Sequence, residues 1–416
     1  MNWQVTVETH VVIQSMTRKP DLFPRSSALS CLRLLALLAL LVSLSACRML
    51  NPLNWFSDDE VEQPAELTAI NQQVPMRRLW SVSVGNGQGK LYNKLTPILD
   101  GGVLYVASED GEVLAINSVN GNIQWRNRTR ETITGGVGAG RGMVMVGTEN
   151  AEVLVLNQTD GSLLWRAPVS SEVLSAPQTN GDIVVLQTVD DKLIALDADD
   201  GSQRWIYETT LPVLTLRGTS NPLIAQNAVL AGFSNGTVVA VNAQDGVWRW
   251  EERVAVPQGR YDIERVIDVD GDLMLAGGNV VLASSYQGNL MGFDIQSGRI
   301  VWGLEASSYH GLAEGFGNIY YCDQRGHIVA VRSGSDTEVW RNDSLDLRRV
   351  SAPTTFNNYV VVADFEGYVH LLSQLDGQVV GRLRVDNNGV RARPIVGNNT
   401  LFVYGNSGRL TAIALQ

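Results

Sequence analysis

GEVLAINSVNGNIQW, residues 111–125, is a sequence motif that recurs along most of this 416-residue chain, and we call each copy a phrase. An apolar run leads to Asn or Asp, a glycine follows four residues later, and a tryptophan follows four residues after that. Further copies begin at Ala151, Asp191, Gly236, Gly288, Gly326, Gly367 and Gly408. Successive copies therefore start 40, 40, 45, 52, 38, 41 and 41 residues apart. A period of this length is typical of propeller blades with four strands each.

Each repeat unit contains the pattern of four short strands. In the first unit they are expected at residues 96–99, 103–107, 112–117 and 122–125. The turn between the last two strands carries Asn or Asp, which bond their own backbone, and a glycine that tolerates positive φ. The tryptophan after that turn offers a large apolar surface, and we expect it to pack between adjacent blades.

The two ends of the repeat array complement each other. Residues 77–80, Arg-Arg-Leu-Trp, form a tryptophan strand that has no phrase before it, and the last phrase ends at the C-terminus without such a strand. The seventh phrase has Gly381 in place of its tryptophan. We predict that the strand at 79–80 joins the sheet formed by 402–404 and 409–415. The predicted fold is an all-β, eight-bladed β-propeller of four-stranded antiparallel blades, closed by an N-terminal strand that completes the last blade.

An open solenoid of similar units is the competing interpretation of this repeat. Solenoids usually end in atypical polar caps, whereas the two ends here look like parts of one blade. The solenoid would also leave sheet edges unpaired at both ends, and such edges invite aggregation. The closed ring is therefore the favoured architecture.

The N-terminal segment has the pattern of an export signal. Basic residues precede an apolar run at 34–44, which is too short to span a bilayer, and Cys47 follows it. Residues 44–47, Leu-Ser-Ala-Cys, resemble the bacterial lipobox, in which the cysteine is acylated after cleavage. An ordinary signal peptidase site with a chance cysteine is the alternative. Residues 1–15 fit no signal pattern, so Met16 is the favoured start.

These features predict three parts of the chain. Residues 1–46 form a lipoprotein signal peptide, residues 47–75 a lipidated flexible tether rich in Pro and acidic residues, and residues 76–416 the propeller. Cys322 is the single cysteine of the third part, which therefore has no internal disulfide. With 43 acidic against 32 basic residues and a net charge of −11, nucleic-acid binding is not expected.

The phrase resembles the propeller repeat first named for quinoprotein (PQQ) dehydrogenases. Together with the lipobox and the chain length, it resembles the BamB family of propeller lipoproteins in the β-barrel assembly machinery. The likeness covers residues 76–416 and the signal. It implies a non-catalytic scaffold that binds the periplasmic POTRA domains of the insertase BamA and assists insertion of outer-membrane proteins. It also implies a lipid anchor at Cys47 in the outer membrane, facing the periplasm, because Arg48 rather than Asp follows the cysteine.

Two segments resemble the part of that family that contacts the insertase. They are Leu-Thr-Leu-Arg-Gly at 214–218 and the acidic Asp-Val-Asp segment at 268–270. The resemblance assigns partner binding to these residues: Leu214, Leu216, Arg217, Asp268 and Asp270. The leucines would be apolar anchors, Arg217 a planar donor, and the two Asp side chains would orient Arg217 or accept partner donors.

Connection lengths point to the same region independently. From a tryptophan to the next phrase, most connections are 24 to 27 residues, but Trp205 to Gly236 is 31 and Trp250 to Gly288 is 38. The connection from Trp80 to Gly111 is also 31. The first two belong to consecutive blades and should emerge side by side on one face, where repeat proteins often bind partners. Without the family resemblance, the favoured interpretation would be that Leu214 and Leu216 are core residues of an inner strand and that Arg217 pairs with a nearby Asp within the chain.

An enzyme of the quinoprotein class is the runner-up function. Such an enzyme needs a cofactor pocket, a calcium-type cation and a carboxylate base, and many use adjacent cysteines, which this chain lacks. The three histidines after residue 47, His310, His327 and His370, have no metal-ligand spacing. Residues 268–272 resemble a calcium loop only weakly, because Leu273 and Asn279 replace its glycine and glutamate. We therefore expect no cofactor, no metal and no catalysis.

Two further points stay open at the sequence level. A polysaccharide-binding propeller would account for the ten tryptophans, although seven of them occupy the repeat position. Unfolded barrel precursors are a second expected partner class. They could add a strand to a sheet edge of the ring, or the ring could only space the domains of the insertase.

Overall fold

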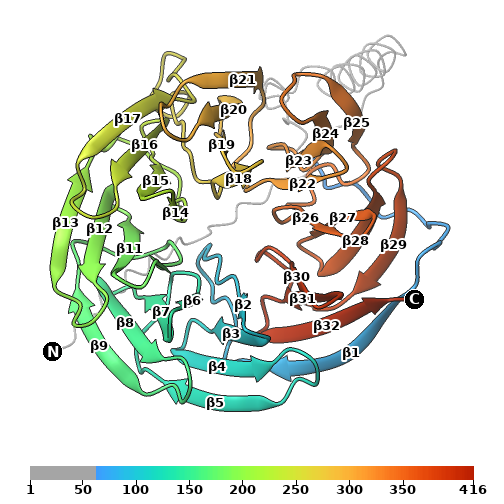
Figure 1. The fold of residues 1–416 in the computed structure, drawn as a ribbon. Coiled ribbons are helices and arrows are strands. Elements are labelled where there is room, and N and C mark those ends of the chain that lie inside the picture. Colours follow the sequence, from blue (N-terminus) through green and yellow to red (C-terminus); the bar gives the residue numbers. More distant parts are fainter. Residues whose placement is uncertain (1–61) are drawn as a thin grey trace, which may run out of the picture. The chain divides into compact units, whose positions relative to one another are not determined.

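The structure, a computed structural model, describes residues 62–416, and this part of the chain is all-β (Figure 1). Residues Gln63–Gln416 form one compact unit. The predicted signal peptide, Cys47 and most of the predicted tether lie outside the described residues. Residues 62–416 contain no helix, and so none that is long and apolar enough to cross a membrane.

Thirty-two strands follow one another along the described chain. In order they are β1 (Met76–Ser83), β2 (Ile98–Asp100), β3 (Val103–Ala107), β4 (Glu112–Asn117), β5 (Ile123–Arg128), β6 (Gly138–Gly140), β7 (Met143–Gly147), β8 (Glu152–Asn157), β9 (Leu163–Pro168), β10 (Gln178–Thr179), β11 (Ile183–Thr188), β12 (Lys192–Asp197), β13 (Gln203–Glu208), β14 (Leu223–Ala225), β15 (Ala228–Gly232), β16 (Thr237–Asn242), β17 (Trp248–Arg253), β18 (Met274–Ala276), β19 (Val280–Ser284), β20 (Asn289–Asp294), β21 (Ile300–Glu305), β22 (Ala313–Gly315), β23 (Asn318–Cys322), β24 (Ile328–Arg332), β25 (Glu338–Asn342), β26 (Thr354–Phe356), β27 (Tyr359–Ala363), β28 (Tyr368–Ser373), β29 (Val379–Arg384), β30 (Ile395–Gly397), β31 (Thr400–Tyr404) and β32 (Arg409–Leu415).

These strands form eight four-stranded antiparallel sheets, the blades of a β-propeller, arranged in a ring (Figure 1). Seven blades consist of four consecutive strands, with the first strand near the axis and the fourth at the rim. The eighth has the order β1-β32-β31-β30, in which Trp80 pairs with Ala412 and Val82 with Leu410. The predicted fold, including closure by the N-terminal strand, is therefore confirmed. The expected strands of the first unit differ from β2 to β5 only at their ends.

The repeated tryptophan joins each blade to the next. The Trp125 indole Nε1 donates to the carbonyl of Gln158 at 3.0 Å, in the turn that precedes the outer strand of the following blade. Equivalent bonds start from Trp80, Trp165, Trp205, Trp250 and Trp340. The Trp125 indole lies against the glycine of that turn: a Cβ on Gly161, whose φ is +73°, would be 2.5 Å from the indole. The predicted packing of tryptophan between blades is confirmed at these six positions.

Trp302 is the exception among the repeat tryptophans of the described chain. The turn of the next blade has Arg332 where most other copies have Asn or Asp, and Asp336 where most others have glycine. Trp302 is only partly buried and lies against Gly292, where an added Cβ would be 2.7 Å from the indole nitrogen. Because the sequence of this turn differs, the contact between tryptophan and turn glycine that joins most other blades is not formed between these two blades.

Gly381 replaces tryptophan at the seam where the ring closes. A Cβ on Gly381 would be 2.8 Å from the carbonyl of Val74, because the segment before β1 crosses the blade there. The amides of Gln73 and Val74 both donate to the carbonyl of Val380, at 2.9 and 3.1 Å. The incoming chain thus occupies the place that a tryptophan fills in most other blades.

The segment before β1 is bonded to the outer part of the ring over several residues. Ala65 N donates to the carbonyl of Asp346 at 2.9 Å, and Arg382 donates to the carbonyl of Thr68 at 2.8 Å. We call residues 65–74 the strap. They belong to the predicted tether, whose boundaries stay a prediction. Apolar clusters fill the spaces between blades, and one of them includes Leu114 of the blade β2–β5 and Tyr404 of the blade that contains β1.

Candidate partner-binding site

The two lengthened connections lie side by side, as their positions in consecutive blades predict. One runs from β13 to β14 and the other from β17 to β18. The Asp268 carboxylate accepts the Leu216 amide at 3.3 Å, and Asn221 Nδ2 donates to Asp272 Oδ1 at 2.7 Å. Both connections join an outer strand to the next inner strand, so they emerge on the same face of the ring.

Apolar side chains on these two connections are exposed. Val213 is 86% exposed, Ile263 70% and Tyr261 67%. Together with Leu211, Leu214 and Val256, which are also exposed, they form a set that we call the loop apolar residues. Leu214 is thus not a core residue, and Leu216 is half-buried. Sequence reasoning singled out Leu214 but missed the other five, although their apolar character within an inserted connection was a usable signal.

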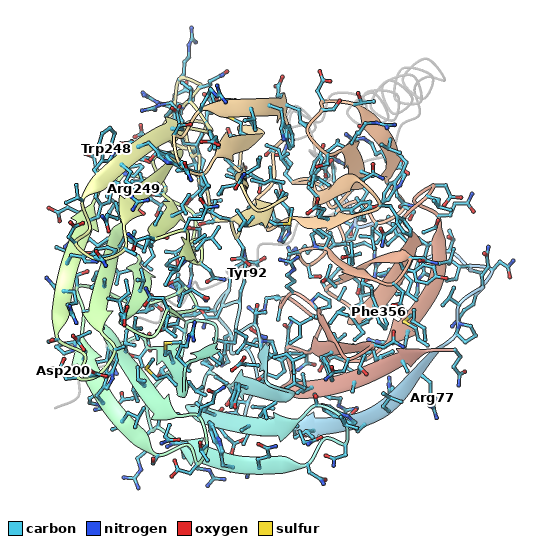
Figure 2. The ribbon with its side chains drawn as sticks, viewed as in Figure 1. Arg77, Tyr92, Asp200, Trp248, Arg249 and Phe356 are labelled. Carbon is cyan, nitrogen blue, oxygen red and sulfur yellow. The ribbon has the colours of Figure 1, made fainter. Side chains whose placement is uncertain are left out.

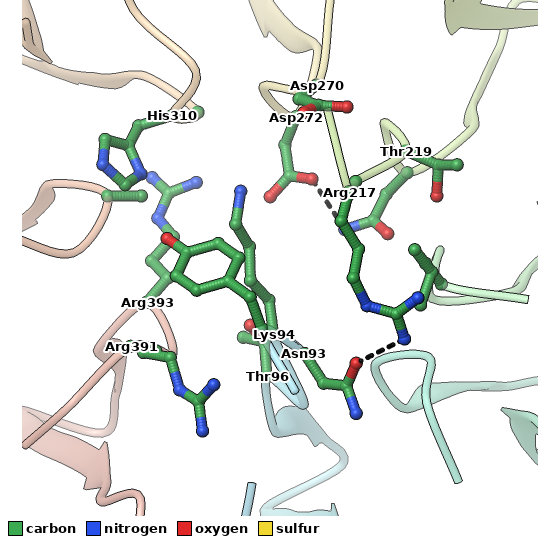
Figure 3. A pocket seen from close by; sticks show the side chains of 16 residues that line it. Asn93, Lys94, Thr96, Arg217, Thr219, Asp270, Asp272, His310, Arg391 and Arg393 are labelled. Carbon is green, nitrogen blue, oxygen red and sulfur yellow. Dashed lines mark hydrogen bonds between the residues drawn. The ribbon is translucent and has the colours of Figure 1, made fainter. Parts of the chain in front are cut away.

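Arg217 is oriented by a partner other than the expected aspartates. Its guanidinium donates twice to the Glu172 carboxylate, at 3.0 and 2.7 Å. It also donates to Asn93 Oδ1 at 3.1 Å (Figure 3). The hydrogen bonds that Arg217 donates to Glu172 raise the pKa of Arg217 above its usual value. The expectation that Asp268 and Asp270 orient Arg217 is not what the structure shows. Glu172 comes from the preceding connection, which the spacing of motifs could not reveal.

Asp268 and Asp270 lie beneath the loop rather than on its surface. They are 2% and 6% exposed, and both face the 214–218 segment. Asp268 holds the Leu216 amide, and a Cβ on Gly218 would be 2.5 Å from an Asp270 oxygen. Burial, and then the charge of Asp270, raises the pKa of Asp268 well above its usual value. Burial likewise raises the pKa of Asp270. They therefore hold the loop backbone in place.

The third lengthened connection, between β1 and β2, enters the axis of the ring (Figure 3). Lys94 reaches the carbonyl of Tyr309 at 3.4 Å, and Arg391 donates to the carbonyl of Gly89 at 2.8 Å. The remaining axial cavity is about 50 Å³, well below the ~300–1,000 Å³ of typical small-molecule sites. Four buried polar atoms that line it have no hydrogen-bond partner within the protein: Asn93 Nδ2, Arg217 Nε, Thr219 Oγ1 and Asp270 Oδ1.

The histidines have structural partners or deep burial. His327 lies between Asp323 and Asp346, at 2.9 Å from each carboxylate. His310 is buried beside the axis, and burial lowers its pKa well below the usual value. Residues 62–416 contain no group of three or more His, Cys, Asp or Glu side chains arranged to hold a metal ion.

His370 is fully buried against Asp364, with 2.9 Å between the ring nitrogen and the carboxylate. Arg348 also binds Asp364, at 2.8 Å, so the carboxylate is shared by two partners. Burial lowers the pKa of His370. Arg348 also donates to the carbonyl of Ala65 at 2.8 Å, so this cluster joins the blade that contains β28 to the strap.

Comparison with known protein families gives one consistent match. The family described as outer membrane protein assembly factor BamB matches residues 62–133, 120–342 and 324–416. A relative with that name from Pseudomonas aeruginosa is 57% identical over 353 residues, which cover 85% of this chain and 93% of the relative. One from Marinobacter adhaerens is 43% identical over 380 residues, which cover 91% and 95%.

Solved structures agree on the architecture. The crystal structure of BamB from Moraxella catarrhalis superposes with a TM-score of 0.75 at 26% identity, covering 82% of this chain and 100% of that chain. Quinohemoprotein alcohol dehydrogenase from Comamonas testosteroni has a TM-score of 0.67 at 14% identity, covering 84% and 78%. At that identity the second likeness shows the fold alone.

Proposed function

Because the chain belongs to the family of the outer membrane protein assembly factor BamB, we propose that it is a non-catalytic scaffold that binds the periplasmic POTRA domains of the insertase BamA. The proposal includes a lipid anchor at Cys47 in the outer membrane, with the ring facing the periplasm. It also includes assistance to outer-membrane β-barrel precursors during their insertion.

The observation that carries this proposal is the exposure of the loop apolar residues on two bonded, neighbouring connections. Leu214, Val213 and Ile263 are exposed to solvent on two connections that hydrogen-bond to each other, and clustered exposed apolar groups often mark a protein contact. Tyr261 adds an aromatic ring of the kind that often dominates binding energy. These side chains would supply the apolar part of the interface.

The polar part of the interface would come from Arg217. Its side chain is 33% exposed, and Glu172 fixes the guanidinium plane with two bonds. A fixed, planar donor loses little conformational entropy when it binds a carbonyl or carboxylate of a partner. The role of Leu216, Asp268 and Asp270 would be indirect. The half-buried leucine and the two carboxylates would hold in place the segment that presents Leu214 and Arg217.

Co-purification from detergent-solubilised outer membranes tests the proposal. We expect Leu214→Asp and Ile263→Asp each to reduce recovery of BamA with this chain by at least about tenfold, as at interface hot spots. Val119→Asp is the matched control, since Val119 is 75% exposed in a turn of the first blade, away from both connections. Equal recovery with all three variants would contradict the assignment of the interface.

Two mechanisms remain within this function. The ring could bind precursors directly, by strand addition to an outer strand, or it could only position the insertase domains. Crosslinking of an unfolded barrel precursor to the ring in the absence of BamA supports direct binding. Crosslinks that form only when BamA is present support positioning. The quinoprotein alternative has its own test, which is dye reduction after addition of quinone and calcium.

A further inference from the structure

The outer strands of the blades divide into two groups by charge. Three outer strands that are consecutive around the rim, β29, β1 and β5, carry six arginines and no acidic residue. The six are Arg382, Arg384, Arg77, Arg78, Arg126 and Arg128, and we call them the basic arc. The other five outer strands, β9, β13, β17, β21 and β25, carry five arginines and five glutamates. In a chain with a net charge of −11, such segregation requires an explanation.

Five of the six arginines of the basic arc are exposed, whereas Arg382 is half-buried and binds the strap. Arg77, Arg78 and Arg384 are exposed, and Arg77 lies at the outer edge of the ring (Figure 2). Arg128 has 74% of its side chain exposed, whereas its loose ion-pair partner Glu112, at 3.6 Å, has only 10% exposed. The Glu112 carboxylate is therefore largely buried, whereas the Arg128 guanidinium remains available to an anion.

The chain that leads toward the N-terminus docks at one end of the basic arc. Arg382 binds the strap at Thr68, and the edge of β29 accepts the amides of Gln73 and Val74. Only fourteen residues lie between Cys47 and Glu62, a length of at most about 50 Å when extended. A lipid group on Cys47 would therefore keep the blades of the basic arc within reach of the membrane surface.

We propose that the basic arc docks on the anionic phospholipid headgroups of the membrane. Guanidinium groups bind phosphate oxygens in a bidentate manner, and each basic residue near an anionic leaflet strengthens attachment. The acidic remainder of the protein is repelled by the same surface, so the attraction also sets an orientation. The three blades that contain β29, β1 and β5 lie across the ring from the two lengthened connections, which run from β13 to β14 and from β17 to β18 (Figure 1). Docking therefore leaves the loop apolar residues free for a protein partner.

The inference rests on the lipid anchor of the proposed function only for the choice of a membrane as the anionic partner. Its test needs neither a lipid group on Cys47 nor the insertase. A chain that begins at Arg48 retains the whole compact unit Gln63–Gln416 and lacks the apolar signal run. Its binding is measured by co-sedimentation with vesicles of phosphatidylcholine alone, or of phosphatidylcholine and phosphatidylglycerol in equal parts.

We expect binding only to the vesicles that contain phosphatidylglycerol, and we expect added salt to weaken it. The double variant Arg77→Gln, Arg128→Gln should bind about 25-fold more weakly, since each charge contributes roughly fivefold. The control Arg204→Gln, Arg253→Gln removes the same charge from β13 and β17 and should bind as the unmodified chain does. Circular dichroism confirms that both variants are folded.

Three outcomes would overturn the inference. One is equal binding to the two kinds of vesicle, and another is an equal loss of binding in the control. The third is absence of vesicle binding together with capture of an acidic protein by the unmodified chain but not by the Arg77, Arg128 variant. That result would assign the basic arc to a protein partner. A failure of BamA co-purification, by contrast, would leave the vesicle result unaffected.

Discussion

At the scale of single residues, the pairing of tryptophan and glycine explains why the phrase is repeated so strictly. Gly161 has a positive φ of +73° in its turn, and a Cβ on this residue would clash with the Trp125 indole. The indole then donates to a carbonyl of that turn, so one tryptophan contributes apolar contact and a buried hydrogen bond. Either requirement alone would tolerate some substitution, whereas both together exclude any side chain.

A comparison of two glycines separates these requirements. Gly142 has φ +87° with no atom within 4 Å of an added Cβ, whereas Gly161 combines positive φ with the Trp125 contact. We expect Gly142→Ala to lower the free energy of unfolding by about 1–2 kcal/mol through backbone strain alone. Gly161→Ala should cost about 1–3 kcal/mol more, because the ring must move. Urea unfolding measures both, and equal losses would show that the ring contact adds nothing.

At the scale of elements, the two lengthened connections are held together by buried carboxylates. Asp268 binds the Leu216 amide and lies beside Asp270, so ionisation of both places two like charges in a buried site. Their raised pKa values mean that the folded chain holds protons more tightly than the unfolded chain. Stability from this pair is therefore greatest at low pH and falls as pH rises above the unfolded value of about 3.9.

Asp268→Asn tests this electrostatic cost. Asparagine has the shape of the protonated acid, its oxygen can accept the Leu216 amide, and it cannot ionise. The melting temperature of the variant minus that of the unmodified chain should increase as the pH is raised from about 4 to about 7. Differential scanning calorimetry across that range measures the change. A constant difference at every pH would mean that Asp268 does not titrate in this way.

At the scale of the whole molecule, closure depends on one strand supplied from the other end of the chain. β1 pairs with β32 along its length, and Trp80 packs against Phe402 with ring centroids 5.8 Å apart. Each blade otherwise packs only on its neighbours, so loss of β1 would expose the edge of β32 and one face of the first blade. The seam is thus the point on which the integrity of the ring depends.

Two truncations test this dependence. A chain that begins at Val84 lacks β1, whereas a chain that begins at Glu62 retains every described residue. We expect the first to aggregate or to lose its cooperative thermal transition, and the second to melt as the full chain does. A synthetic peptide of residues 74–84 should partly restore the first. A soluble, cooperatively folded chain from Val84 would show that the other seven blades and three strands close the ring unaided.

The sequence by itself determined the architecture, because strand period, turn chemistry and the tryptophan position are local properties that recur in most blades. It also determined that residues 205–236 and 250–288 hold neighbouring insertions, since their order in the repeat places them. Only the tertiary structure decided that Glu172 orients Arg217, that Asp268 and Asp270 are buried, and that the strap replaces a tryptophan at Gly381. These depend on contacts between residues far apart in the chain, and no local pattern encodes which distant groups will meet.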